Sequence, residues 1–304
     1  RTGLDGELAI GLDGEKMPLR AALTDRLDIT RITTALLRLL ADRHDDPELA
    51  TLIDEPARIA DWAWGRQAID LLAAYPVSTG VDEWLSVLPK LTPRLYSISS
   101  SPRTDPGRVE VTVSTVRFDG PAGARHGVCS GYLADLPEQE PVRIFIQRNK
   151  SFGPPEDPAA PMVMIGPGTG IAPFRGFLHD RAAAGATGEN WLFFGEQHRE
   201  TDFYYRDELT RLADDGVLTD LELAFSRDQE DKVYVQHRML DRAAELWDWI
   251  QRGAHIYVCG DASAMARDVD DALHRIVAEH GRLAPSSADA YVRALAADKR
   301  YVRD

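Results

Sequence analysis

Cysteine is scarce in this chain of 304 residues, which contains only Cys129 and Cys259 and no CxxC pair. The scarcity argues against a disulfide framework and against a cysteine zinc site, and it makes the cytoplasm the expected compartment. The eight histidines show no HExxH or other ligand spacing, so we expect no metal site. Apolar runs stay short of the ~20 residues of a membrane-spanning helix, and no signal peptide is visible.

Positive charge is also in short supply, because 35 Lys and Arg stand against 49 Asp and Glu, a net charge of −14. This excess of acid argues against nucleic acid and anionic membranes as partners. It suits a basic protein partner, or it reflects only a solvated surface. The length and a hydrophobic content of 44% are sufficient for two domains with real cores.

The first part of the sequence predicts a helical block followed by strands. Helices are expected within residues 19–88, where LRAALTDRL and ITTALLRLLADR carry apolar residues at helical spacing. DWAWGRQAIDLLAAYP should form one helix stopped by Pro76, and VDEWLSVL a short helix. Strand patterns follow over residues 94–100, 108–118 and 141–147. A proline-rich stretch, residues 151–161, predicts a linker.

The remainder of the sequence alternates between strand and helix patterns. We expect strands at PMVMIG, NWLFFG, LELAFS and HIYVCG, each followed by a helix, and a last helix near ADAYVRALAADK. Such alternation predicts a parallel sheet with helices on both faces. Ligands of these sheets bind at the carboxyl ends of the strands, so we expect ligand-binding residues in the loops that follow the strands.

The loop GPGTG follows the first of these strands and opens a helix in the stretch 166–176. Glycine permits positive φ and lets a phosphate approach the backbone, and the amides at a helix N-terminus bind anions. We therefore interpret Gly168, Thr169 and Gly170 as a phosphate-binding turn. The alternative is a tight strand–helix turn with no ligand.

Two later strand ends carry further candidates. The stretch AFSRDQEDKVYVQ places Ser226, Arg227 and Lys232 at one strand end, with the Tyr234 ring available for stacking. These groups suit the 2′-phosphate that separates NADPH from NADH, whereas the alternative is a surface ion-pair cluster with the acids at 228, 230 and 231. The strand HIYVCG places Cys259 where a nicotinamide ring can lie, and the alternative there is a buried structural cysteine.

The stretch RLYSISSSP, residues 94–102, combines a cation, an aromatic ring and hydroxyls. Arg94 offers a fork for a pyrophosphate, Tyr96 a flat face for an isoalloxazine, and Ser97 a small hydroxyl for flavin N5. Some thirty residues later, GVCSGYLADL places Gly127 before a helix whose first amides, with the Ser130 hydroxyl, can meet the same pyrophosphate. The alternative, a serine-rich edge strand, explains the hydroxyls but not this combination.

Taken together, RLYSISSSP, GVCSGYL, MIGPGTGIAPFRGF, AFSRDQEDKVYVQ and YVCGDASAMARDV resemble, in this order, the NADPH-dependent diflavin reductases. That family includes cytochrome reductase, and NWLFFGEQH and the closing KRYVRD look most like its bacterial sulfite reductase flavoprotein. The resemblance implies an α/β plus β-barrel fold of the ferredoxin-NADP reductase type: an antiparallel flavin-binding barrel with a helical connecting insertion, then a doubly wound parallel-sheet NADP domain. The implied segments are a partial barrel segment (1–18), the connecting domain (19–90), the FAD-binding barrel (91–157) and the NADPH-binding domain (158–304).

The resemblance also implies the site residues. FAD would be bound by residues of two segments, namely Arg94, Tyr96, Ser97, Thr112, Ser114, Gly127, Val128, Cys129 and Ser130. NADPH would be bound by residues that follow the parallel strands, namely Gly168, Thr169, Gly170, Ser226, Arg227, Lys232, Tyr234, Gln236 and Asp261. The residues that match the family's hydride-transfer trio are Ser97, Cys259 and Asp304.

The family activity implied is hydride transfer from NADPH to FAD. Electrons then leave singly through an FMN domain or a flavodoxin-like protein toward a haem or iron–sulfur acceptor, first of all the sulfite reductase haemoprotein. Nitrate reductase and haem mono-oxygenase systems remain alternative acceptors, and a non-redox NADP-binding regulatory module is a further alternative. A hydrolase using Ser97 or Ser130 is disfavoured, because no GxSxG elbow is present.

The sequence departs from the family pattern in four respects. It contains no flavodoxin-like FMN domain, and it begins inside the pattern, without the early barrel strands and their Pro-Gly-Asp turn. Asp304 stands last, where the family continues to an aromatic that covers the flavin. SFGPPEDP replaces the usual Phe-Arg-Leu-Pro, so that Gly153 takes the place of an NADPH-facing arginine. These departures predict a more exposed flavin and an incomplete barrel.

Overall fold

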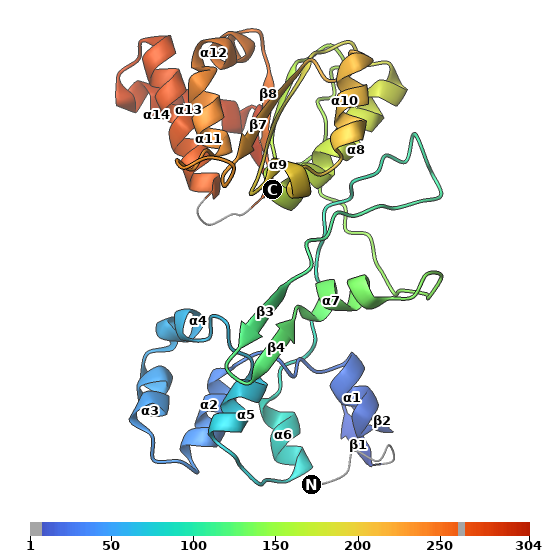
Figure 1. Cartoon of the computed structure of the whole chain (residues 1–304), viewed down its shortest axis with the longest axis vertical. Coiled ribbons are helices and arrows are strands. Elements are labelled where there is room, and N and C mark those ends of the chain that lie inside the picture. The colour runs from blue at the N-terminus through green and yellow to red at the C-terminus, as the bar shows by residue number, and fades with distance from the viewer. Residues whose placement is uncertain (1–7, 261–264) are drawn as a thin grey trace. The chain divides into compact units, whose positions relative to one another are not determined.

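The computed structural model describes residues 8–260 and 265–304, and the chain divides into two compact units (Figure 1). The first unit comprises Arg1–Leu95 and Ser114–Pro141, and the second comprises Tyr96–Val113 and Val142–Asp304. Within the described ranges, no helix is both long enough and apolar enough to cross a bilayer.

The first unit consists of short helices and two antiparallel strand pairs. The strands are β1 (Ala9–Leu12) with β2 (Glu15–Pro18), and β3 (Arg117–Gly120) with β4 (Gly123–His126). The helices are α1 (Leu19–Asp25), α2 (Thr34–Ala41), α3 (Pro47–Asp54), η1 (Pro56–Arg58), α4 (Ile59–Trp62), α5 (Ala68–Ala74), α6 (Val81–Val87) and α7 (Val128–Asp135).

Capping side chains set where the central helices begin. Thr33 Oγ1 accepts a hydrogen bond from Leu36 N at 3.1 Å at the start of α2. Asp46 does the same for α3, whose first residue, Pro47, lacks the amide that would otherwise need a partner. The two helices and α5 bury a leucine-rich core, which comprises Leu36, Leu37, Leu39, Leu40, Leu49, Leu52 and Leu71.

Two details of the part of the chain before β5 differ from expectation. The helix expected to run unbroken up to Pro76 is instead two, α4 and α5, because Gly65 adopts a positive φ of 74° between them. The strands expected over 94–100 and 141–147, most of whose residues belong to the second unit, are not formed in the described structure. Ile98 and Val111 form an isolated bridge, and 108–118 otherwise contributes only the start of β3. Alternating apolar residues give a segment one face to bury but do not supply a strand to pair with.

The second unit is built on a parallel sheet with strand order β7-β6-β5-β8-β9. The strands are β5 (Met162–Ile165), β6 (Asn190–Glu196), β7 (Asp220–Phe225), β8 (His255–Val258) and β9 (Tyr301–Arg303). The helices are η2 (Gly168–Gly170), α8 (Ile171–Ala184), α9 (Arg199–Asp202), α10 (Arg206–Asp214), α11 (Val235–Asp241), α12 (Ala243–Gln251), α13 (Met265–Gly281) and α14 (Pro285–Ala297).

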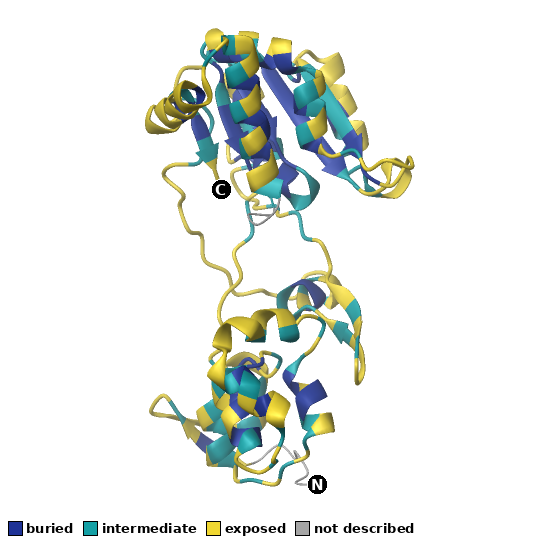
Figure 2. Cartoon of the chain, turned by 90° about the vertical axis from the view of Figure 1, so that its left-hand side faces the viewer, coloured by how far each residue is buried: buried dark blue, intermediate teal, exposed yellow. Residues whose placement is uncertain are grey.

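Both faces of this sheet are buried, as Figure 2 shows for the strands of the second unit. Successive side chains of a strand point to opposite faces, so Val163 and Ile165 enter the core that α11 to α14 cover. Met162 and Met164 enter the other core, which α8 and α10 cover. The central strand β5, which is apolar at every position rather than at alternate ones, suits a sheet that is covered on both faces.

The fold class expected from the sequence is confirmed, with antiparallel strands in the first unit and a five-stranded parallel sheet in the second. Two features of the second unit differ in detail. The single helix expected after β7 is two, α11 and α12, separated at Arg242. Strand β9 was not predicted, because three residues are too few for a periodic signal.

Candidate functional site

Strands β5 and β8 are neighbours in the middle of the sheet, and their carboxyl ends lie side by side. From β5 the chain continues to β6 on one side, whereas β8 pairs with β5 on the other side, so the strand order reverses here. A ligand site is expected at such a reversal of strand order. The two loops there touch: a Cβ at Gly170 would lie 2.0 Å from the Cys259 carbonyl oxygen. Gly168 in turn has a positive φ of 58°. Glycine at both positions is therefore required by the backbone itself, whatever the loop binds.

Ser97, Cys259 and Asp304 come together at this edge of the sheet, although they are far apart in the sequence. Ser97 Oγ donates to Asp304 Oδ2 at 3.2 Å, and Cys259 Sγ donates to the same oxygen at 3.9 Å. Asp304 N also donates to Val258 O at 3.0 Å, which continues the pairing of β9 with β8. The three residues grouped by the sequence resemblance thus form one hydrogen-bonded cluster.

The thiol of this cluster is held in its protonated form. Burial, and after it the negative charge of Asp304, raise the pKa of Cys259 to about 11. Its side chain is a donor to Asp304 rather than a thiolate at neutral pH. The neutral thiol can hold the Asp304 carboxylate in place, and this carboxylate can stabilise a positive charge that develops nearby. The protonated thiol itself is a poor nucleophile.

Asn149 is a member of this cluster that the sequence analysis missed. Its Nδ2 donates to Asp304 Oδ1 at 3.0 Å, while its Oδ1 accepts from the amide and the hydroxyl of Ser151 at 3.1 and 2.9 Å. The side chain therefore fixes both the carboxylate and the start of the segment 151–161. No sequence motif marks this asparagine, because its partner lies 155 positions away.

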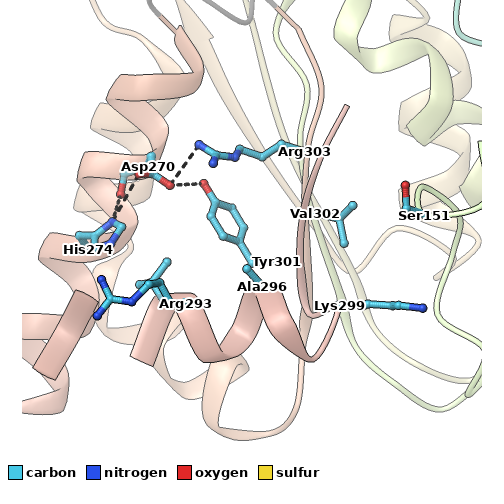
Figure 3. Close-up of a pocket in the computed structure, with 10 residues that line it drawn as sticks. Ser151, Asp270, His274, Arg293, Ala296, Lys299, Tyr301, Val302 and Arg303 are labelled. Atoms are coloured by element: carbon cyan, nitrogen blue, oxygen red, sulfur yellow. Dashed lines mark hydrogen bonds and ion pairs between the residues drawn. The ribbon is translucent and has the colours of Figure 1, made fainter. Parts of the chain in front are cut away.

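Strand β9 is itself held from the side of α13 and α14, as Figure 3 shows. Tyr301 OH donates to Asp270 Oδ1 at 2.8 Å, and Arg303 Nη1 lies 3.4 Å from the same oxygen. Asp270, Tyr301 and Arg303 line a pocket of about 390 Å³, and Arg293 and Lys299 also contribute to its lining. The result is that the strand immediately before Asp304 is anchored on a helix as well as on β8.

The end of β7 carries the expected hydroxyl and cations. Ser226 is buried and its Oγ donates to Glu196 O at 3.3 Å. Arg227 and Lys232 are exposed and form no ion pair with any described residue. Among the described residues, the acids at 228, 230 and 231 form no ion pair with these two cations, and Asp228 pairs instead with His198 at 3.1 Å. Two unpaired cations on a strongly acidic chain fit a phosphate.

The remaining NADPH candidates are found nearby or cannot be placed. Tyr234 precedes α11 and its ring, 42% exposed, lies 5.8 Å from that of His237. Gln236 donates to Asp268 at 3.1 Å, while its buried Oε1 has no partner among the described residues. Asp261 lies outside the described residues. Thr169 is half-buried within η2.

The flavin candidates of the second unit are Tyr96, Ser97 and Thr112. Tyr96 is half-buried. Thr112 Oγ1 is 2.6 Å from Tyr205 OH, and Tyr205 has a positive φ of 58°, a conformation that non-glycine residues adopt at a cost. The hydrogen bond to Tyr205, the residue immediately before α10, thus fixes the position of the Thr112 side chain.

The flavin candidates of the first unit are Arg94, Ser114 and the residues 127–130. Arg94 bonds to Thr92 O at 2.5 Å and lies 3.4 Å from Asp28, and Ser114 is exposed. A Cβ at Gly127 would lie 2.5 Å from Ser130 Oγ, so glycine is needed before α7.

The start of α7 offers donors for an anion. Ser130 Oγ accepts from Val116 N at 3.1 Å, which leaves its own proton free to donate. The first turn, with Val128 and Cys129, has backbone amides without intrahelical partners. This donor set fits a pyrophosphate.

Comparison with known proteins gives two domain matches and a set of relatives. Residues 14–132 match the FAD binding domain family, and residues 164–271 match the oxidoreductase NAD-binding domain family. The chain is 44% identical, over 99% of its length, to the sulfite reductase (NADPH) flavoprotein alpha-component of Yersinia enterocolitica. It is 45% identical over 99% to that of Yersinia pestis and 43% identical over 97% to that of Mannheimia succiniciproducens. The chain spans about half the length of these curated relatives.

Proposed function

Because the chain belongs to the NADPH-dependent diflavin reductase family, we propose that it works as an FAD-containing NADPH reductase module. The observation that carries this proposal is the cluster of Ser97, Cys259 and Asp304 at the carboxyl edge of the parallel sheet. We assign the FAD barrel to residues 91–157, the helical connecting domain to 19–90 with a barrel segment at 1–18, and the NADPH domain to 158–304. Both cysteines are free, which supports a cytoplasmic location.

The cofactor contacts are proposed from the donor sets already described. The first amides of α7 and Ser130 would hold the FAD pyrophosphate together with Arg94, and Tyr96, Ser97, Thr112 and Ser114 would contact the flavin. Gly168, Thr169 and Gly170 would hold the NADPH phosphates. The adenosine phosphate end would be bound by residues after β7, namely Ser226, Arg227, Lys232, Tyr234 and Gln236.

The chemistry is supplied by the bound cofactors, since FAD accepts hydride from NADPH and returns electrons one at a time. The chain supplies position and charge. The Asp304 carboxylate would stabilise positive charge on a bound nicotinamide, and the protonated Cys259 thiol donates to this carboxylate and keeps it in place. The Ser97 hydroxyl donates its single proton to the same carboxylate oxygen, and rotation of the hydroxyl would let it donate to a neighbouring nitrogen instead.

The electron acceptor is proposed from the relatives, which are sulfite reductase flavoproteins. Electrons would pass through an FMN domain or a flavodoxin-like protein to a sulfite reductase haemoprotein. Reductases for nitrate reductase or for haem mono-oxygenases use the same kind of module and are the alternatives. Acceptor reduction by the NADPH-reduced chain, with each acceptor and with an FMN protein added, distinguishes these cases.

The test of the proposal is an anaerobic NADPH titration of the FAD-loaded protein, followed through flavin absorbance. We expect the yellow colour to bleach with NADPH and much less with NADH. Ser97→Ala should slow flavin reduction far more than it weakens NADPH binding, whereas Ser86→Ala, an exposed serine of α6, should do neither. A protein that binds NADP but takes up no FAD contradicts the proposal and favours a regulatory module.

A further inference from the structure

Residues 96–113 of the second unit form a hairpin-like loop whose two sides are tied together. Ser99 N donates to Glu110 O at 2.8 Å, and Glu110 N donates to Ser100 Oγ at 3.0 Å. Ile98 and Val111 form an antiparallel bridge in the same place. Ser97 lies on one side of this loop, immediately before the bridge, so the position of the loop sets where the Ser97 hydroxyl can reach.

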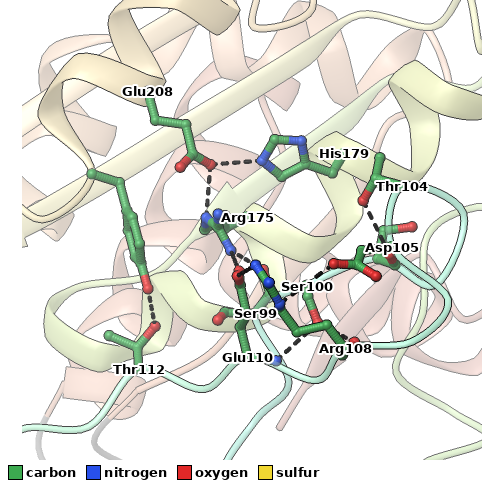
Figure 4. Close-up of polar contacts among 12 residues, drawn as sticks. Ser99, Ser100, Thr104, Asp105, Arg108, Glu110, Thr112, Arg175, His179 and Glu208 are labelled. Carbon is green, nitrogen blue, oxygen red and sulfur yellow. Dashed lines mark hydrogen bonds and ion pairs between the residues drawn. The ribbon is translucent and has the colours of Figure 1, made fainter. Parts of the chain in front are cut away.

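Arg175 of α8 fastens both sides of the loop (Figure 4). Its Nη1 donates to Ser99 O at 2.9 Å and to Glu110 Oε2 at 2.5 Å. Its Nε donates to Glu208 Oε1 of α10 at 2.7 Å, and that same oxygen lies 2.6 Å from His179 Nε2. One guanidinium thus joins the loop to two helices of the parallel-sheet layer.

The Tyr205 ring completes this connection. The Arg175 guanidinium carbon lies 4.9 Å from the centre of the Tyr205 ring, and the Tyr205 hydroxyl lies 2.6 Å from Thr112 Oγ1. The loop is therefore held to α8 and α10 near Ser99, near Glu110 and near Thr112. The side chain of Arg175 is only 15% exposed, so its contacts are shielded from water and count for more than those of a surface pair.

The residue type matters at this position. A guanidinium presents several donors in a rigid plane, so it can serve a carbonyl, two carboxylates and a ring face at once. A lysine ammonium is a compact charge that can reach some of these partners but cannot stack in the same way. The arrangement uses the fork geometry of arginine rather than its charge alone.

From these contacts, and resting on the proposed hydride transfer, we infer that Arg175 is a positioning residue that holds Ser97 against Asp304 and Cys259. Arg175 fixes the backbone of Ser99, two residues from Ser97, and Ser97 Oγ contacts the carboxylate that Cys259 also contacts. Loss of the guanidinium releases the loop and lets the hydroxyl drift from the reacting atoms. A misplacement near 1 Å is enough to lower a rate by about 10²-fold.

The experiment measures flavin reduction by NADPH in a stopped-flow instrument, using the FAD-loaded chain. Arg175→Met keeps most of the apolar stem and removes the fork, so we expect the limiting rate to fall about tenfold or more. The dissociation constant for NADP⁺ should stay within about twofold, because the residues after β7 are untouched. Arg175→Lys should recover part of the rate.

A second measurement separates positioning from a merely structural role. If Arg175 acts through Ser97, then Arg175→Met should slow the Ser97→Ala protein far less than it slows the wild type. Arg103→Met is the matched control, because Arg103 bonds Asp180 of α8 from the outer part of the same loop and its side chain is 59% exposed. This control should leave the rate within about twofold.

The outcomes are distinct. A wild-type chain whose bound FAD is not reduced by NADPH contradicts the proposed function itself. If the wild type has a normal rate and Arg175→Met has the same rate, the inference is overturned while the proposed function stands. The inference is also overturned if the double variant loses as much rate as the product of the losses of Arg175→Met and Ser97→Ala. Should Arg175→Met fail to retain FAD, Glu110→Gln takes its place: a lowered rate with NADP⁺ affinity kept supports the inference, and an unchanged rate overturns it.

Discussion

Replacing Gly170 by alanine tests whether the loop after β5 must touch the loop after β8. The added Cβ would lie 2.0 Å from the Cys259 carbonyl oxygen and 2.7 Å from its carbonyl carbon, whereas ordinary contact begins near 3.4 Å. Both obstructing atoms belong to the backbone, so no side chain can swing away. One of the two loops must retreat by more than 1 Å, and the retreat displaces Cys259 or the GPGTG turn.

The loss of stability expected for Gly170→Ala can be compared with the loss expected for the same substitution at a nearby glycine. Overpacking against backbone costs about 1–3 kcal/mol, and for a domain of 150–250 residues each kcal/mol lowers the unfolding midpoint by roughly 2–4 °C. We therefore expect Gly170→Ala to lower the midpoint by about 6–12 °C at the upper end of that cost. Gly168→Ala is the matched control, because it incurs only the penalty of a positive φ, about 1–2 kcal/mol, and its Cβ would meet just Glu196 Oε1 at 3.6 Å.

Thermal unfolding followed by circular dichroism, with and without NADP⁺, is the measurement. Gly170→Ala should melt lower than Gly168→Ala and should bind NADP⁺ more weakly than the wild type. A midpoint for Gly170→Ala within about 2 °C of the wild type, or equal losses for the two variants, refutes the close contact between the loops.

Three further outcomes are expected. Burial opposes ionisation of Glu208, but hydrogen bonds from His179 and Arg175 lower its pKa from 4.5 to about 2. Its contribution to stability is therefore full above pH 4.5 and is lost as the pH falls toward 2. The free energy of unfolding should therefore separate wild type from Glu208→Gln at pH 7 and less so at pH 3, and a gap that does not change contradicts this. Because burial raises the pKa of Cys259 to about 11, iodoacetamide at pH 8 should modify Cys129 first, as peptide mass spectrometry can check. Asp70 is buried and accepts from Arg125 at 2.7 Å, so Asp70→Ala should cost about 3–5 kcal/mol in urea unfolding, and a loss below 1 kcal/mol argues against the pair.

The parallel sheet and its ligand edge were predictable because their signals are local. Strands such as β5 are apolar at every position, glycines mark the turns, and helices such as α10 and α13 have clear amphipathic faces. Placement of Cys259 at a strand end, and of Gly168 and Gly170 before α8, follows from this alternation alone. The family resemblance added Asp304, which no local pattern marks.

The parts that were not predicted depend on long-range partners. Residues 144–146, Ile-Phe-Ile, form a short apolar run typical of a strand but are exposed, and no described strand pairs with them. Asn149 and Arg175 act through contacts with residues distant in the sequence. The break at Gly65 was not predicted because it depends on the positive φ of this residue, which the apolar pattern of the flanking helices does not indicate.

The order of the strands separates the residues that we propose for coenzyme choice from those that we propose for hydride transfer. Strand β7, before Arg227 and Lys232, and strand β9, before Asp304, are the two outer strands of the sheet. Four inter-strand spacings of about 4.8 Å place them roughly 19 Å apart, beyond the range over which substitutions usually influence one another. An engineer could therefore retune preference for NADH or NADPH at one border of the sheet while leaving the reacting groups at the other untouched.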